Sequence, residues 1–139
     1  MTQTAPNSVT ITRDLAYPQD RVWRALTSGA LLAEWLMPND FQPVTGHRFQ
    51  FRAPPMPQWD GLVDAEVLEI RPQDLLILRW ESGALKTTLS FTLTPSGAGV
   101  RLQVEQTGFG PDQMQNLKGA EWGWPRNLDR LAALLAKED

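Results

Sequence analysis

The stretch that decides the fold runs from Pro111 to Leu135 and reads PDQMQNLKGAEWGWPRNLDRLAALL. Its large apolar residues are separated by three, seven, four, three and four positions, which is the spacing of one helix face. They are Met114, Leu117, Trp124, Leu128, Leu131 and Leu135. We therefore predict a long terminal helix from about Pro111, with about 24 residues and a length of about 36 Å, and one apolar face that must be covered.

The residues before this helix alternate between apolar and polar side chains, which is the period of a half-buried strand. Six segments show the alternation, at residues 9–15, 47–52, 61–70, 75–80, 87–94 and 100–105. Clusters of proline, glycine, serine and aspartate separate the last four segments and are typical of hairpin turns. The pattern predicts an antiparallel sheet with one apolar face and one polar face.

Two short helices are predicted between the first and second strands. Pro18 suits the first turn of a helix, and Val22 and Leu26 give that helix an apolar face. A second helix is predicted over residues 31–36, and Pro38 ends it.

The expected fold class is therefore α+β, with a curved six-stranded antiparallel sheet wrapped around the terminal helix. We found no linker, repeat or low-complexity tract, so we expect a single domain over residues 1–139 with its core at about 8–136. One helix cannot touch the whole apolar face of six strands. A cavity between sheet and helix is a natural outcome, and ligands bind in such places.

Composition excludes several classes of function. The net charge is −3 and the pI about 5.1, so no nucleic-acid partner is expected. The absence of cysteine removes disulfides and thiolate chemistry, and it fits a reducing, cytoplasmic location. No apolar stretch approaches the length of about 20 residues that a membrane span needs. The opening MTQTAPNSVT has no basic or apolar region typical of a secretory signal.

Several motifs resemble one known family. The resemblance rests on Tyr17–Leu26, on Leu32–Trp35, on the hairpin from Gly61 to Trp80, and on Gly123-Trp124 with the leucines that follow. In order and spacing these motifs are similar to the activator of heat-shock-protein-90 ATPase homologue family, within the START-like, birch-pollen-allergen-like (SRPBCC) helix-grip superfamily. The likeness covers about residues 8–136. It implies the helix-grip fold, and it implies activation of a chaperone ATPase in stress response as one function.

If a cavity exists, its lining should come from large residues on the inner faces of the elements. We expect the ligand-binding residues to be Trp35, Met37, Phe49, Phe51, Trp59, Trp80, Phe91, Met114, Leu117, Glu121 and Trp124. The alternative is that the tryptophans on apolar stripes, such as Trp80, are plain core. Trp59 and Trp122 lie off these stripes, so they could line the mouth.

No constellation of catalytic residues stands out. His47 is the only histidine and has no second histidine for a metal, so a surface position at a strand end is expected. Asp64 and Glu66 share the outer strand face, where acids are usually solvated. Apart from Thr87 and Gln106, the inward face carries no polar residue. We therefore expect no metal, no cofactor and no catalysis.

Pro125 interrupts the terminal helix pattern. An interior proline removes one hydrogen bond and clashes one turn back. The sequence predicts one of two outcomes, a kink at residues 121–124 or two helical segments that meet at Gly123. Either could act as a gate for a ligand, or the kink could merely follow the curvature of the sheet.

Three functions remain open at this stage. The first is a non-catalytic module that encloses a small apolar or aromatic ligand. The second is an interaction protein that acts on a chaperone, and the third is a cyclase- or aromatase-like enzyme of the wider superfamily. The sequence does not identify the ligand or the oligomeric state.

Overall fold

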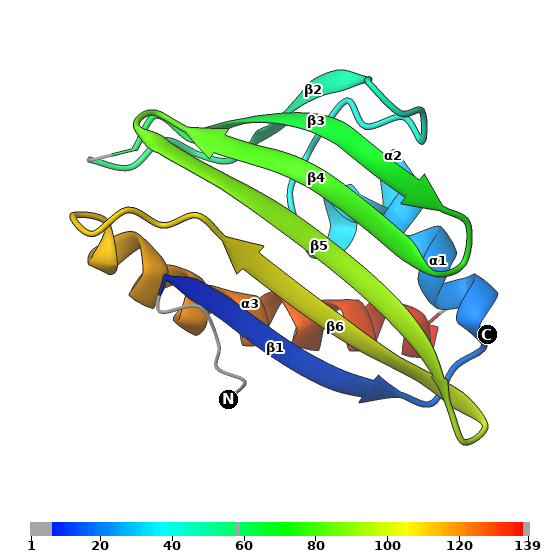
Figure 1. The fold of residues 1–139 in the computed structure, drawn as a ribbon. Coiled ribbons are helices and arrows are strands. Elements are labelled where there is room, and N and C mark those ends of the chain that lie inside the picture. Colours follow the sequence, from blue (N-terminus) through cyan, green and yellow to red (C-terminus); the bar gives the residue numbers. More distant parts are fainter. Residues whose placement is uncertain (1–6, 58, 138–139) are drawn as a thin grey trace.

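A six-stranded antiparallel sheet curves around a long C-terminal helix in the computed structural model (Figure 1). The structure describes residues 7–57 and 59–137, so the predicted lack of a signal at residues 1–6 lies outside it. The strands are β1 (Ser8–Leu15), β2 (Arg48–Arg52), β3 (Leu62–Arg71), β4 (Leu75–Ser82), β5 (Leu85–Ser96) and β6 (Gly99–Thr107). The predicted α+β helix-grip class is confirmed.

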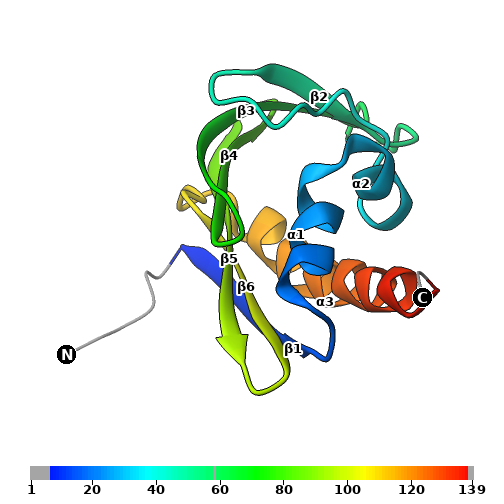
Figure 2. The same ribbon diagram turned by 90° about the vertical axis from the view of Figure 1, so that its right-hand side faces the viewer.

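The strand order is β1-β6-β5-β4-β3-β2, so β1 and β2 are the two edges of the sheet. The chain passes from one edge to the other through two helices, α1 (Gln19–Thr27) and α2 (Gly29–Trp35). Figure 2 shows both short helices on the same side of the sheet as α3 (Met114–Lys137). Among the described residues, no helix is long and apolar enough to cross a bilayer.

The concave face of the sheet forms the core with the helices, because one face of every strand is apolar. All of the inner-face positions expected from the alternation are buried. They are Phe49, Phe51, Val63, Ala65, Val67, Leu76, Leu78, Trp80, Leu89, Phe91, Leu93, Val100, Leu102 and Val104. From α3, Leu128, Leu131 and Leu135 pack against this face and are fully buried.

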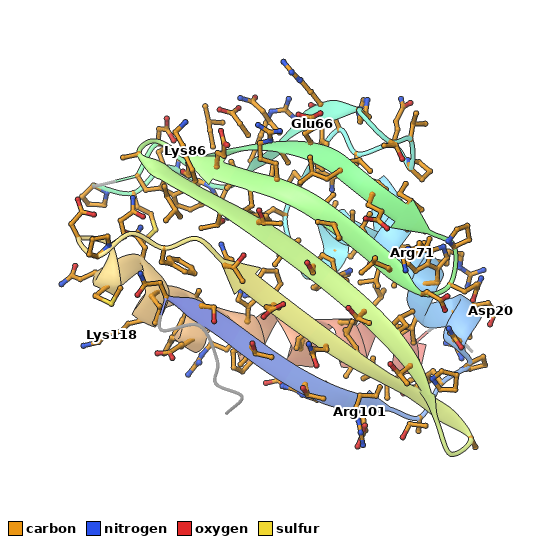
Figure 3. The ribbon with its side chains drawn as sticks, viewed as in Figure 1. Asp20, Glu66, Arg71, Lys86, Arg101 and Lys118 are labelled. Carbon is orange, nitrogen blue, oxygen red and sulfur yellow. The ribbon has the colours of Figure 1, made fainter. Side chains whose placement is uncertain are left out.

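The convex face carries charged side chains, several of which Figure 3 labels. Glu66 of β3 lies between two cations, 3.5 Å from the guanidinium of Arg48 and 3.4 Å from that of Arg79. Glu81 lies 3.8 Å from Lys86 on the neighbouring strand. Opposite charges therefore alternate across β2 to β5, and this face is suited to contact with water.

The terminal helix begins at Met114, three residues later than the pattern suggests. The side chain of Gln113 explains this start, because its carbonyl oxygen accepts the Gly110 N–H at 2.7 Å. Its amide group also donates to the Ala84 carbonyl at 3.0 Å in the β4–β5 turn. The residues before Met114 are thus held in a turn, and the helix begins where that turn ends.

α3 is continuous through Pro125, so the expectation of two segments joined at Gly123 is wrong. Arg13 of β1 bonds to the same turn, with 3.3 Å to the Pro125 carbonyl and 2.8 Å to the Asp129 carboxylate. This contact and the leucine seam hold the helix on the sheet despite the missing N–H. A ligand gate formed by two helical segments that meet at Gly123 is therefore excluded.

Replacing Pro125 with alanine should raise the free energy of unfolding by about 1–2 kcal/mol. An interior proline costs about 3 kcal/mol, and removing it loosens the unfolded chain by about 1 kcal/mol. Urea denaturation followed by tryptophan emission measures the change. An unchanged or lower free energy of unfolding would mean that the helix is already relaxed around the proline.

Leu131→Ala, in the same leucine seam, should instead lower the free energy of unfolding by about 2–5 kcal/mol, as for other buried leucines.

Candidate functional site

A groove with a volume of about 1000 Å³ lies between the sheet and the N-terminal half of α3. The end of α2, the β2–β3 connection, and the inner faces of β3, β4 and β6 form its other walls. Its size is that of pockets that hold small organic molecules.

Small side chains on α3 leave room for this groove. Besides Gln115, Trp122 and Trp124, α3 lines the groove with smaller residues that fall on one helical face: Asn116, Gly119, Ala120, Gly123 and Asn127. A Cβ atom built at either glycine would have nothing within 4 Å apart from its own surroundings in the helix. Glycine within a helix lowers helix stability by about 1 kcal/mol relative to alanine. Two glycines four residues apart therefore destabilise this part of α3 while leaving the space beside it unfilled.

Aromatic rings form much of the wall. Trp80 of β4 and Trp124 of α3 both line the groove, and their ring centroids lie 6.0 Å apart. Trp59 closes one side, and its indole N–H donates to the Ser82 hydroxyl at 2.7 Å. Such faces suit flat apolar ligands, since aromatic pairs attract through their rings.

A chain of hydrogen bonds crosses the floor. The Trp124 indole donates to the Gln106 carbonyl oxygen at 2.9 Å, and the Gln106 amide donates to the Thr87 hydroxyl at 3.0 Å. Thr87 then donates to the Trp80 carbonyl at 2.7 Å. Gln106 and Thr87, the two polar residues expected on the inner face, are both buried, and each makes two hydrogen bonds in this network.

Charged side chains are absent from the described residues that line the groove. The groups with shifted pKa values lie on the outer surface instead. A hydrogen bond from Arg52 lowers the pKa of Asp40, and one from Arg101 lowers the pKa of Asp14. The groove itself offers amides, one hydroxyl and aromatic rings, which bind and orient but do not transfer protons near neutral pH.

Four of the expected ligand-binding residues meet at this groove: Met37, Trp59, Trp80 and Trp124. Trp35, Phe49, Phe51 and Phe91 are buried in the main core and do not line it. On α3, Met114 and Glu121 are exposed, and Leu117 packs into a small cluster with Val9 and Phe109. Of the four α3 residues predicted to line a cavity, Trp124 does so, and Met114, Leu117 and Glu121 do not.

The other candidate residues lie apart from the groove. His47 stacks on Phe49 with ring centroids 5.7 Å apart, and its Nε2 is 2.9 Å from the Asp40 carbonyl oxygen. Asp64 accepts a hydrogen bond from Gln50 at 2.8 Å on the convex face. Within residues 7–57 and 59–137, no cluster of three acidic or histidine side chains is arranged to hold a metal.

Several lining residues were missed or undervalued from sequence. Gly119 and Gly123 gave a signal, because a glycine pair inside a helical pattern calls for a packing or functional reason. Ser82 gave none, since it reads as a turn residue. Trp122, suggested as a mouth residue, does line the groove and is 63% exposed, with the Arg126 guanidinium 3.8 Å above its ring.

The curved sheet, the two helices after β1 and the long terminal helix define a START-like helix-grip protein. Residues 16–136 match the family described as Activator of Hsp90 ATPase homolog 1-like protein, and the chain belongs to this family. The resemblance stated from the sequence is therefore confirmed. No curated protein matches the chain.

Solved structures share the fold along nearly the whole chain. The protein MLL2253 from Mesorhizobium loti is 40% identical, with a TM-score of 0.89 over 96% of this chain and 99% of its own. NE0264 from Nitrosomonas europaea is 21% identical, with a TM-score of 0.82 and full coverage of both chains. DynU16, described as a protein in the dynemicin biosynthetic locus, is 24% identical with a TM-score of 0.81, over 96% of this chain and 48% of its own.

Replacing Gln106 with leucine should lower the free energy of unfolding by about 1–3 kcal/mol, because the buried Trp124 N–H loses its acceptor. Gln103→Leu is the matched control, since Gln103 is on the same strand but exposed. It should change stability by less than about 0.5 kcal/mol. Urea denaturation of both variants measures the difference. Equal effects at the two positions would show that the hydrogen-bond chain contributes nothing net.

Proposed function

We propose that the protein is a non-catalytic binding module that holds a small apolar or aromatic molecule in the groove between the sheet and α3. One observation carries this proposal: a groove of about 1000 Å³ is lined by tryptophans and by Gly119 and Gly123, which have open space beside them. A protein stabilised only by its core would gain by filling that space, since buried apolar contact contributes about 25 cal/mol per Å².

The chemistry of the lining supports binding over catalysis. Acid–base catalysis needs a placed group that can gain or lose a proton near neutral pH. The described groove residues are apolar, aromatic, amide or hydroxyl side chains, none of which titrates in that range. A cyclase- or aromatase-like reaction would therefore have to rely on shape and hydrogen bonding alone, and it is the weaker hypothesis.

A graded series at Gly123 tests the proposal. Gly123→Ala should keep ligand binding and stabilise the helix by about 0.5–1 kcal/mol. Gly123→Leu should fill the groove and abolish binding while the protein stays folded, because the new side chain enters open space. Thermal shift with a panel of neutral aromatic and aliphatic compounds provides the readout, since a ligand that binds only the folded state raises Tm.

The control for this series is Ala133→Leu, at an exposed position of the same helix. It should leave every thermal shift unchanged. If no compound shifts the wild-type Tm, or if Gly123→Leu binds as well as Gly123→Ala, the groove is not the binding site.

The family description raises a second candidate, activation of the Hsp90 ATPase. The observation in its favour is a pair of exposed apolar side chains at the groove mouth, Met56 and Trp122, each 63% exposed. Against it, the convex face is a lattice of paired charges, whereas a stable interface buries about 1,000 Å² or more with an apolar centre.

We predict no stimulation of the Hsp90 ATPase by this chain at micromolar concentration. A coupled assay of phosphate release measures it, with an established activator as the positive control. Stimulation that disappears in Trp122→Ala but persists in Ala133→Leu would reverse the ranking of the two functions.

A further inference from the structure

Gln106 is held in one orientation by its neighbours. An indole N–H can only donate, so the Gln106 atom 2.9 Å from Trp124 Nε1 must be the carbonyl oxygen. At the other end of this series of hydrogen bonds is the Trp80 backbone carbonyl, which can only accept. The Thr87 hydroxyl therefore donates its proton to that carbonyl. Thr87 must then accept from the Gln106 amide. Rotating the amide by 180° would break both bonds of Gln106.

This orientation leaves one strong donor unused. A primary amide has two N–H groups, and the bond to Thr87 occupies one. The second has no partner among the described residues, although Gln106 is only 3% exposed. A buried donor without a partner is costly, and Gln106 lines the groove, so a ligand oxygen is the natural partner.

The surroundings restrict the charge of that ligand. No lysine, arginine or histidine is among the described lining residues, so a carboxylate would be desolvated without a counter-ion. A neutral carbonyl or hydroxyl oxygen can accept the same hydrogen bond at lower cost. The tryptophan faces beside it favour a flat ring system.

We infer that Gln106 is a specificity-determining residue, and that the groove selects neutral aromatic molecules whose carbonyl or hydroxyl oxygen accepts its free N–H. This inference rests on the proposed function. It goes further in naming the ligand class and the atom that recognises it.

Three naphthalenes of similar shape test it by isothermal titration calorimetry at neutral pH: 2-acetylnaphthalene, 2-ethylnaphthalene and 2-naphthoate. The wild type should bind the ketone about three- to tenfold more tightly than the hydrocarbon, the value of one net hydrogen bond. It should bind the carboxylate more weakly than the ketone. Gln106→Met should bind the two neutral compounds equally, through loss of ketone affinity alone.

Gln103→Met is the matched control, because Gln103 is exposed on the same strand, and it should keep the wild-type preference. A second measurement does not depend on a variant that folds. In ¹⁵N-labelled wild type, the ketone should move one of the two side-chain amide proton signals of Gln106, and the hydrocarbon should not.

The outcomes separate the two proposals. If none of the three compounds binds the wild type, both the proposed function and this inference fail for such ligands. If the neutral pair binds equally and shifts groove residues such as Gly123 but not the Gln106 amide, only the role of Gln106 is overturned. Persistence of the ketone preference in Gln106→Met, or tighter binding of the carboxylate, would also overturn it.

Discussion

The concave apolar face of the sheet must be kept from water, and three helices do this unequally. At one end, the leucines of α3 pack with buried residues of α1 and α2 in one core over the strands. The two short helices are tied together there, because the buried Trp35 indole donates to the Ala25 carbonyl at 3.0 Å. At the other end, the N-terminal half of α3 lies beside the groove. The same requirement therefore gives a packed core at one end and a groove at the other.

Trp124 lies at the boundary between these two regions. Its ring packs against Phe91 of the core, with centroids 6.0 Å apart, and also forms part of the groove wall. Its indole N–H needs an acceptor when buried, and Gln106 supplies one near the end of β6. Burying a polar residue in an apolar face costs less when it is hydrogen-bonded, as Gln106 is to Trp124 and Thr87. The hydrogen bonds that run from Trp124 through Gln106 and Thr87 to Trp80 thus tie α3 to β4, β5 and β6.

Periodicity was enough to predict the sheet, the three helices and the buried face of β2 to β6, because burial acts directly on alternation and helical spacing. It could not say which inner-face residues border a void. Trp35 and Trp80 both lie on apolar stripes, yet only Trp80 lines the groove, since the path of α3 decides this. On α3 itself, Met114 and Leu117 drew attention by size. The groove instead faces the smaller residues beside them. The spacing of apolar residues does not reveal this rotation of α3 about its own axis.

Family membership and the groove carry different kinds of information. The family fixes the scaffold, whereas the space depends on Gly119 and Gly123, where any larger side chain would enter the groove. Activation of an ATPase calls for an exposed surface, while enclosing a ligand calls for an internal space. Met56 and Trp122 are exposed and also line the groove, so the proposed binding function and the chaperone alternative would involve the same side chains.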